Sequence, residues 1–259
     1  MSTKKLIAFD LDGTLAPSKS PLPDLMGELI DQLLTKYQVC VISGGMFTQF
    51  QKQLLANLKA DPMQLENLHL MPTCGTRYYK YDIAKKDWET IYAEDFTEAE
   101  KTKIMIALKS AVDKLGYGNE KSYGPNYEDR GSQITWSALG QNIAAELGPK
   151  GVEIKEAWDV DNSKKNAVRN EAAVLLPEFE VRVGGVTSVD ITKPGIDKAY
   201  GMKKLMEMLE ISKEEILFIG DRIEEGGNDY PVKQMGIDCV GINHWEDTAH
   251  TVQGILYVS

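Results

Sequence analysis

Apolar and polar positions alternate in blocks near the N-terminus. Apolar runs at 5–10 and 38–45 are typical of short buried strands. Apolar residues at helical spacing predict helices over 24–36 and 48–58. The order strand, helix, strand, helix predicts βαβ units and a parallel sheet.

The same alternation returns near the C-terminus. The pattern predicts a helix over 197–209 and strands over 216–221 and 238–242. Ser212 and Glu215 have the spacing of a capping box. We therefore expect both ends of the chain to build one α/β core.

The middle of the chain has a different pattern. A long amphipathic helix begins at a capping box, Thr97 with Glu100, and later segments favour two strands and a second helix. The predicted ranges are 97–115 (helix), 132–139 (strand), 163–176 (helix) and 179–185 (strand). A sheet with two helices indicates a small α+β domain over 84–186, inserted into a core of 1–83 and 187–259.

Composition and charge narrow the range of possible functions. The chain has 259 residues, 42% of them apolar and 26% charged, which is typical of a globular protein. Its formal net charge of -10 argues against nucleic acid or an anionic membrane as a partner. The apolar run that follows Lys4 and Lys5 is too short for a signal peptide, and no stretch approaches the length of a membrane span.

The three cysteines are scattered. Cys40, Cys74 and Cys239 show no CxxC spacing. This favours reduced thiols and a cytoplasmic location, with Cys40 and Cys239 buried in strands.

Four apolar runs end in polar signatures. These are Asp10-x-Asp12, Ser43-Gly44, Gly75-Thr76 and Asp221. Because ligands of parallel sheets bind at the carboxyl ends of the strands, neighbouring strands would bring these residues together. Clustered carboxylates raise each other's pKa and need a cation, and Mg²⁺ prefers oxygen ligands.

Two aspartates one residue apart can divide an acid–base reaction. Asp10 is a candidate nucleophile towards phosphorus. Asp12 could protonate the leaving oxygen and later activate a water, since different environments drive two carboxyl groups to opposite protonation states. The alternative is that both residues cap the next helix or bind a structural ion.

These residues carry a family resemblance. FDLDGTL (9–15) resembles the first motif of the haloacid dehalogenase superfamily, and Ser43 in VISGG resembles the second. Lys198 resembles the third motif, and GDRIEEGGNDY (220–230) resembles the fourth. The resemblance implies a Rossmann-like parallel-sheet core, an aspartyl-phosphate intermediate and Mg²⁺.

The resemblance also implies roles for the other motif residues. Ser43, with Gly44 and Gly45 beside it, would bind the transferred phosphate, and Lys198 would neutralise its charge. A lysine in a first helical turn is otherwise often solvated.

The implied metal ligands are Asp10, the backbone carbonyl of Asp12, and Asp221. Asn228 and Asp229 would hold the metal and its waters. The alternative is that Asn228 or Asp229 caps the next helix, and both roles can hold at once.

The insert resembles a type IIB cap (C2B), and more narrowly the phosphomannomutase branch. GGVTSVDITKPGIDKAYG (184–201) and EDRGSQITWSALGQ (128–141) carry this likeness. The cap strand of that branch runs from one arginine to another; Arg130 matches the first, but Gln141 occupies the second position. A mutase must grip a phosphate at each end of a bisphosphorylated sugar, and glutamine is uncharged.

Other cap residues are implicated by the same likeness. Ser188 and Asp190 would face the hydroxyl groups of a sugar. Arg130 would bind substrate or pair with Glu128 or Asp129. Lys150 or Arg169 could supply the charge that Gln141 lacks.

Three functions therefore remain open. The first is a Mg²⁺-dependent phosphatase acting on a sugar phosphate or a similar small metabolite, and the second is a phosphohexomutase. The third is a non-catalytic sugar-phosphate binder, which the presence of Asp10, Asp12, Lys198 and Asp221 disfavours. The expected partner is a phosphorylated small molecule, and the expected assembly is a monomer or a cap-mediated homodimer.

Overall fold

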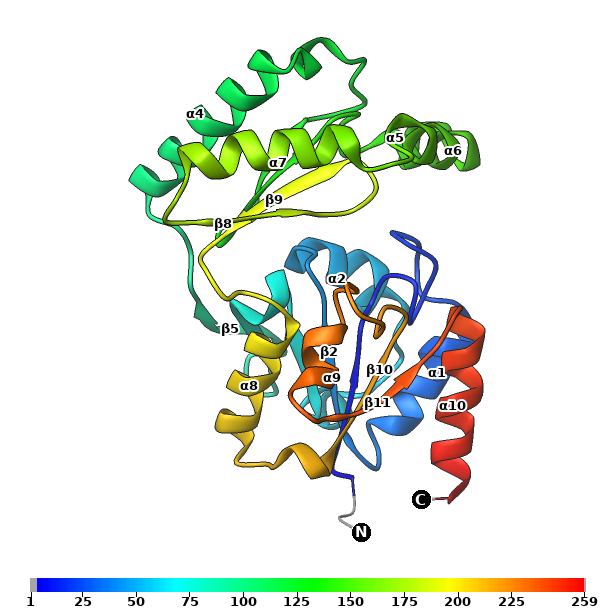
Figure 1. The fold of residues 1–259 in the computed structure, drawn as a ribbon. Helices are drawn as coiled ribbons and strands as arrows, with labels where there is room; N and C mark the ends of the chain where they lie inside the picture. Colours follow the sequence, from blue (N-terminus) through cyan, green and yellow to red (C-terminus); the bar gives the residue numbers. More distant parts are fainter. Residues whose placement is uncertain (1–3, 259) are drawn as a thin grey trace. The chain divides into compact units, whose positions relative to one another are not determined.

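The computed structural model describes residues 4–258 and divides into two compact units (Figure 1). The first, the core unit, takes the residues up to Ala93 together with those from Ile196 on. The second, the cap unit, is Glu94–Gly195. The α/β core with an α+β insert that the sequence predicts is confirmed.

The core unit is built on a seven-stranded sheet of order β11-β10-β1-β2-β3-β4-β5. The five strands from β11 to β3 are parallel, and β4 and β5 add an antiparallel hairpin at one edge. The bounds are β1 (Leu6–Phe9), β2 (Gln38–Ile42), β3 (Leu68–Met71), β4 (Arg77–Asp82), β5 (Asp87–Ala93), β10 (Ile216–Gly220) and β11 (Asp238–Gly241).

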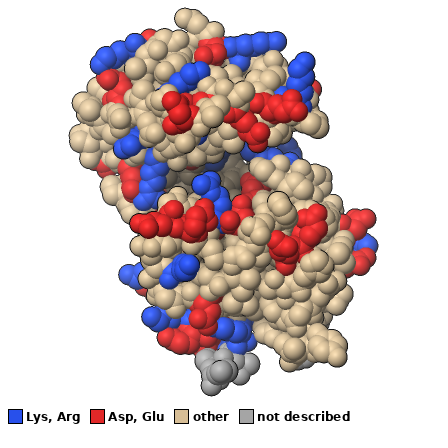
Figure 2. Space-filling view, turned by 45° about the vertical axis from the view of Figure 1, so that its right-hand side comes forward, with Lys and Arg blue, Asp and Glu red and all other residues tan. Residues whose placement is uncertain are grey.

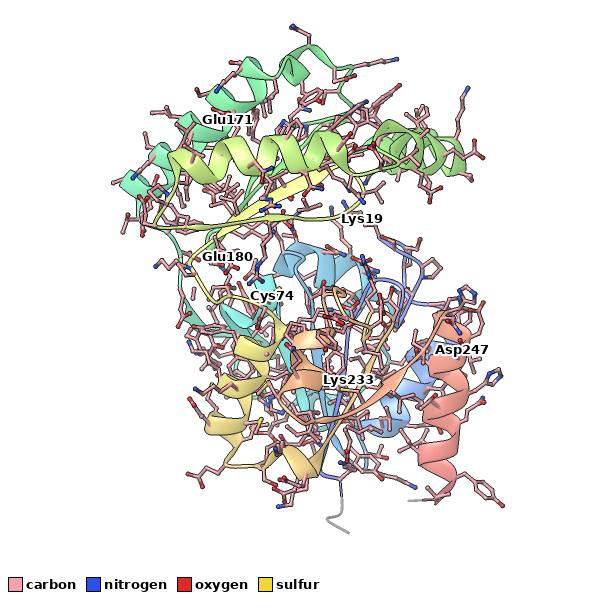
Figure 3. All side chains as sticks on the ribbon, in the orientation of Figure 1. Lys19, Cys74, Glu171, Glu180, Lys233 and Asp247 are labelled. Atoms are coloured by element: carbon pink, nitrogen blue, oxygen red, sulfur yellow. The ribbon has the colours of Figure 1, made fainter. Side chains whose placement is uncertain are left out.

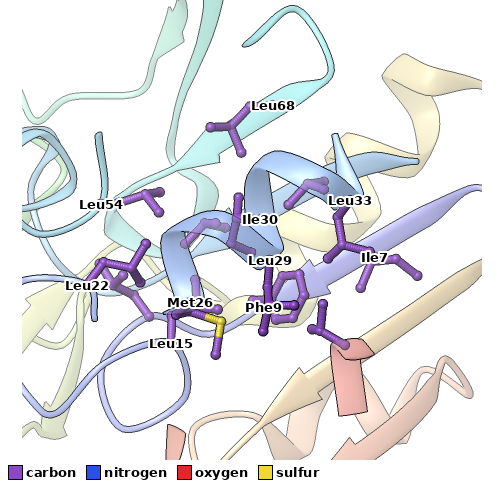
Figure 4. Packing of buried hydrophobic residues seen from close by; sticks show 14 of the residues in the cluster. Ile7, Phe9, Leu15, Leu22, Met26, Leu29, Ile30, Leu33, Leu54 and Leu68 are labelled. Atoms are coloured by element: carbon purple, nitrogen blue, oxygen red, sulfur yellow. The ribbon is translucent and has the colours of Figure 1, made fainter. Parts of the chain in front are cut away.

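Both faces of β1 are buried, which explains its unbroken apolar run. Ile7 and Phe9 pack on one face with α1 (Figure 4). Leu6 and Ala8, on the other face, belong to a second apolar cluster with α8. The core helices are α1 (Asp24–Leu33), α2 (Phe47–Gln53), α3 (Pro62–Leu65), α8 (Lys198–Leu209), α9 (Tyr230–Gln234) and α10 (Trp245–Val258).

The cap unit is a four-stranded antiparallel sheet of order β6-β7-β9-β8 with helices on one face. Alternate strand residues such as Ile134, Trp136 and Val189 share a buried cluster with Ile104 and Leu108 of α4. The bounds are α4 (Glu98–Lys114), β6 (Tyr127–Asp129), β7 (Gln133–Ser137), α5 (Ile143–Leu147), α6 (Pro149–Trp158), α7 (Ser163–Leu175), β8 (Glu180–Val183) and β9 (Ser188–Thr192).

The limits of the insert differ from the expected 84–186. At the first crossing, β5 pairs with β4 from Asp82↔Asp87 to Arg77↔Ala93, so this hairpin extends the core sheet. At the second, β9 lies between β7 and β8, which places Ser188 and Asp190 in the cap sheet. Periodicity identifies a strand but not its partners, so the expected start at 84 and the expected end at 186 both precede the limits of the cap unit, Glu94 and Gly195.

The capping box at Thr97 and Glu100 starts α4, as its spacing predicts. The box at Ser212 and Glu215 is also formed, and it begins a single 3₁₀ turn before β10. Cys40 is buried in β2, as expected. Cys239 also lies in a strand, β11, but it is only half-buried.

Acidic side chains outnumber basic ones over the whole sequence, and on the face shown in Figure 2 they gather in clusters with Lys and Arg between them. Within residues 4–258, no helix combines the length and the apolar character needed to cross a membrane.

Candidate active site

Two neighbouring parallel strands deliver the first two carboxylates. Asp10 follows β1 and Asp221 follows β10, and the register pairs Phe9 with Ile219. The Asp10 backbone N–H donates to the Ile219 carbonyl at 3.0 Å. Asp10 is 3% exposed, so its carboxyl group lies in a nearly dry environment.

Lys198, the first residue of α8, is buried in an ion-pair network. Its Nζ lies 2.6 Å from Asp10 Oδ1 and 2.5 Å from Asp229 Oδ1, and the residue is 1% exposed. The second oxygen of Asp229 accepts the Arg222 backbone N–H at 3.1 Å. A buried ammonium needs such partners, and the alternative of a solvated lysine is excluded.

Asp10, Asp221 and Asp229 form a cluster in which one oxygen of each lies within 4.8 Å of the others. Both oxygens of Asp229 already have donors. Asp221 Oδ1, by contrast, is buried without a hydrogen-bond partner among the described residues. Three carboxylates face one ammonium here, so the cluster can accept further positive charge.

The turn after β1 leaves room for Asp221. Gly13 has a φ of 85°, and a Cβ built there would lie 2.5 Å from Asp221 Oδ2. A side chain at this position would displace the carboxylate. The glycine of the DGT sequence therefore serves close approach as well as the turn.

Burial dominates the electrostatics of the cluster. It raises the pKa of Asp10 to about 7, against the lowering effect of Lys198. Burial, and then the charge of Asp229, also raises the pKa of Asp221. For Lys198 burial acts downward, but Asp10 and Asp229 together outweigh it and hold its pKa above the usual value. A cation at the cluster would favour the ionised carboxylates.

Asp12 has different surroundings. Its side chain accepts hydrogen bonds from Gln49 Nε2 at 2.7 Å, Gln53 Nε2 at 3.0 Å and the Lys19 backbone N–H at 2.6 Å. Its carboxylate does not belong to the cluster of Asp10, Asp221 and Asp229. The two aspartates of the DxD sequence thus lie in separate environments, as a division of labour requires.

The loop after β2 presents Ser43, which is buried. Its Oγ accepts the Gly45 backbone N–H at 3.2 Å. The loop after β3 holds this segment from the side, because the N–H groups of Thr73 and Cys74 donate to the carbonyls of Gly45 and Ser43 at 3.0 and 2.9 Å. Neighbouring parallel strands place both loops at the same edge of the sheet as Asp10.

The loop after β3 is backbone-strained. Thr73 and Cys74 have φ values of 49° and 56°, and Gly75 has 82°. A Cβ at Gly75 would lie 2.4 Å from Gly201 Cα of α8. Gly75 and Thr76, expected as a polar strand end, therefore serve the shape of the loop: Thr76 Oγ1 donates to the Thr73 carbonyl at 2.8 Å.

Asn228 and Asp229 separate in the structure. Asp229 is 0% exposed and joins the carboxylate cluster, whereas Asn228 is exposed. Asp229 occupies the N-cap position of α9, but its side chain makes no capping hydrogen bond. The alternative of a helix cap is therefore excluded for Asp229.

The cap residues lie on or beside the polar face of the cap sheet. Thr135 Oγ1 donates to Asp190 Oδ1 at 2.7 Å, and Gln133 Nε2 donates to Thr135 Oγ1 at 3.0 Å. Arg130 pairs with Glu128 at 2.6 Å, the second of the two arrangements expected for it. Ser188 begins β9 opposite Ser137.

Gln141 lies in the turn that follows β7. Its backbone N–H donates to the Pro125 carbonyl at 3.1 Å. Its side-chain Nε2 is buried without a hydrogen-bond partner among the described residues. An unpaired buried amide is costly, so this donor is available to a ligand.

Gln49 and Gln53 were not singled out by any sequence pattern. They lie on one face of α2, four residues apart, and glutamines in an amphipathic helix are ordinarily solvated. The signal that could have found them is their spacing of four residues in the helix that directly follows the SGG loop, which puts both amides on the face that carries the buried Gln53.

The sequence and the fold were compared with those of known proteins. The family model of haloacid dehalogenase-like hydrolases matches residues 7–232. The chain belongs to this family. The match spans β1 to α9 and so includes both the core motifs and the inserted cap.

Among curated proteins, the chain is 25% identical over 258 residues to a phosphomannomutase of Encephalitozoon cuniculi, covering 98% of this chain and 94% of that protein. It is 24% identical to phosphomannomutase 1 of Mus musculus, with 88% and 82% covered.

Two solved structures share the fold. The IMP-nucleotidase of Plasmodium falciparum bound to IMP matches with a TM-score of 0.70 and 16% identity, covering 98% of this chain and 68% of that one. A trehalose-6-phosphate phosphatase related protein matches with a TM-score of 0.58 and 14% identity, covering 98% of each chain. These likenesses concern the fold alone.

Proposed function

We propose that this chain is a Mg²⁺-dependent phosphatase that acts on a phosphorylated sugar or a similar small metabolite through an aspartyl-phosphate on Asp10. The observation that carries the proposal is the buried Asp10–Lys198–Asp229 network with Asp221 beside it. A purely structural cluster would not need a buried carboxyl oxygen without a donor, as in Asp221.

The residues fit a hard divalent cation. All donors at the cluster are oxygens, Asp221 Oδ1 is unpartnered, and Gly13 keeps the approach to Asp221 open. Asp10, Asp221 and the backbone carbonyl of Asp12 are the proposed ligands, and Asp229 braces Lys198. Asn228, which is exposed, is proposed only to contact waters around the metal. When bound, Mg²⁺ would neutralise charge on the phosphate and favour the ionised form of Asp10.

The reaction has two halves. A carboxylate oxygen of Asp10 attacks phosphorus, the bond from phosphorus to the leaving oxygen breaks, and protonated Asp12 gives its proton to that oxygen. A water then attacks phosphorus and gives a proton to Asp12. The bond between phosphorus and the Asp10 oxygen breaks, so phosphate is released and the Asp10 carboxylate is regenerated. Ser43, with the backbone at Gly44 and Gly45, is proposed to hold the phosphate oxygens, and Lys198 to balance their charge.

The cap unit is proposed to select the substrate. Its polar sheet face carries hydroxyl, amide and carboxylate groups, among them Ser188 and Asp190, which suit hydroxyl groups of a sugar. Arg130 is proposed as a substrate contact that its pairing with Glu128 would orient.

Gln141 favours hydrolysis over isomerisation. Its buried, unpartnered amide can donate to a neutral or an anionic oxygen, but it brings no positive charge to grip a second phosphate. Without a firm hold on a bisphosphate, water takes the phosphoryl group. The second candidate, a phosphohexomutase, is favoured by the full-length likeness to phosphomannomutases.

One assay separates these candidates. The protein is incubated with Mg²⁺ and a panel of hexose 1- and 6-phosphates, with and without a hexose bisphosphate, and free phosphate and isomerised sugar phosphate are both measured. Release of phosphate supports the phosphatase. Isomer formed faster than free phosphate identifies a mutase, and binding without either product identifies a non-catalytic binder.

A further inference from the structure

Asp12 is enclosed by three donors, two from helix α2 and one from its own loop. Gln49 Nε2 donates to Asp12 Oδ2 and Gln53 Nε2 donates to Asp12 Oδ1, at 2.7 and 3.0 Å. The Lys19 backbone N–H adds a third donor to Oδ1, and Figure 3 shows Lys19 on the loop that follows β1. Three hydrogen bonds from two elements fix the orientation of this one carboxyl group.

The two glutamines also hold each other. Gln49 Nε2 lies 2.9 Å from Gln53 Oε1, so one amide group contacts both Asp12 and the second glutamine. Gln53 is 3% exposed, and its backbone carbonyl accepts the Leu22 N–H at 2.8 Å and Asn57 Nδ2 at 3.1 Å. Gln53 is therefore held firmly in the core unit.

Gly45 provides the space that Gln49 needs. A Cβ built at Gly45 would lie 2.2 Å from Gln49 Oε1. The loop that carries Ser43 and the helix that orients Asp12 are thus packed directly together. A side chain at residue 45 would disturb both.

We propose that Gln49 and Gln53 are positioning residues that hold the Asp12 carboxyl group in the orientation from which it transfers protons. The inference rests on the proposed function, because it requires Asp12 as the acid and the base. A carboxamide suits this task, since it offers N–H donors to a carboxylate and, after rotation, an oxygen acceptor to a carboxylic acid. A lysine or arginine would offer donors only.

Gln49→Leu is the principal test, because Gln49 is only partly buried and the change removes its donors at similar size. We would measure kcat/KM for a series of aryl phosphates with leaving groups of increasing pKa. We expect a loss of about ten- to hundredfold for the poorest leaving groups and little change for the best, because only poor leaving groups need the proton. The dependence on leaving-group pKa thus becomes steeper.

The matched control is Gln51→Leu, the same change at an exposed position of the same helix. It should leave the dependence unchanged. A loss in Gln49→Leu that is equal for all leaving groups would show a structural role only and overturn the inference. If Gln49→Leu does not fold, Gln49→Met, which is unbranched and also lacks donors, replaces it.

Asp12→Asn separates this inference from the proposed function. If Asp12→Asn leaves the leaving-group dependence unchanged, the role of Asp12 itself is wrong. If Asp12→Asn steepens it but Gln49→Leu does not, only the positioning role fails. In the double variant, we expect no further steepening beyond Asp12→Asn, since the glutamine acts through the carboxyl group.

Discussion

Charged side chains are used differently in the core unit and in the cap unit. In the core unit, Asp10, Asp229 and Lys198 are almost completely buried and lie within one ion-pair network, which joins the end of β1 to the starts of α8 and α9. In the cap unit, the corresponding polar surface is a sheet face whose buried members are mostly hydroxyl and amide groups, such as Thr135 and Gln133.

The difference has a physical basis. Buried charges are expensive unless they are paired, so a site that keeps three carboxylates together must gain from a cation. Neutral groups on a strand face cost less to bury and recognise hydroxyl groups through hydrogen bonds. This difference supports the proposal that the core unit carries out the reaction and the cap unit selects the substrate.

The largest expected effect on activity comes from loss of the proposed nucleophile in the core unit. Asp10→Asn should lower turnover by roughly 10⁴-fold or more, because a carboxamide cannot form the covalent intermediate. Acid quenching followed by intact-mass measurement should find the phosphoryl adduct in the wild type and none in the variant. An adduct that persists in Asp10→Asn would place the nucleophile elsewhere.

The next effect concerns the metal. Asp221→Asn should abolish Mg²⁺-stimulated activity, yet leave the metal-free protein equally or more stable, because it removes one charge from a repulsive cluster. Activity would be titrated with Mg²⁺, and the free energy of unfolding measured in urea with a chelator present. Near-normal activity at ordinary Mg²⁺ concentrations would contradict the ligand assignment.

Asp12 should give a smaller and substrate-dependent loss. Asp12→Ala removes a proton transfer worth roughly 10²–10⁴-fold, and an aryl phosphate with a good leaving group should lose less than a sugar phosphate. The ratio of kcat/KM for the two substrates is the readout. An equal loss on both would argue against acid–base catalysis by Asp12.

A charge added to the cap unit tests the other side of the comparison. Gln141→Arg replaces a neutral donor with a cation, and a charge-assisted hydrogen bond is worth roughly 1.5–3 kcal/mol. A hexose bisphosphate should therefore inhibit about ten- to hundredfold more strongly, and the ratio of isomer to free phosphate should rise. Gln51→Arg, on an exposed face of α2, is the control for added charge alone. If the hexose bisphosphate inhibits Gln141→Arg no more strongly than the wild type, Gln141 does not decide between hydrolysis and isomerisation.

The smallest effect is the pH dependence of stability that comes from His69, one of three histidines that all lie in the core unit. Burial, and then Lys80, holds the pKa of His69 well below its usual range, and the ring contacts Tyr78 and Gln38 at 2.8 and 2.7 Å. The unfolded chain takes up this proton below about pH 6.5, so the contribution of neutral His69 to stability is complete above that pH and declines below it.

We would compare His69→Gln with the wild type, because an amide can keep both hydrogen bonds. The unfolding free energy of the wild type should fall relative to the variant by up to about 1.4 kcal/mol for each pH unit below 6.5. The difference between the two proteins cancels the other titrating groups. A difference that is constant from pH 5 to pH 8 would show that His69 is not held neutral.

Local patterns predicted many, but not all, of the elements of both units. Helix predictions at 97–115 and 163–176 correspond to α4 (Glu98–Lys114) and α7 (Ser163–Leu175). The strands that end in carboxylates were also predicted, because an apolar run followed by a charged residue is visible within a few positions. The cap helices α5 and α6 were missed, since their apolar positions form no clear stripe. The β4–β5 hairpin, β6 and the C-terminal helix α10 were not predicted either.

By itself, the sequence determined the α/β core, the presence of an insert and the carboxylates at the strand ends, since each depends on residues close together in the chain. Tertiary structure alone decided that β9 joins the cap sheet and that Lys198 pairs with Asp229, 31 positions away. It also decided that Gln49 and Gln53 surround Asp12. Such contacts depend on strand register and on how a helix is rotated against a loop, and neither leaves a periodic signal in the sequence.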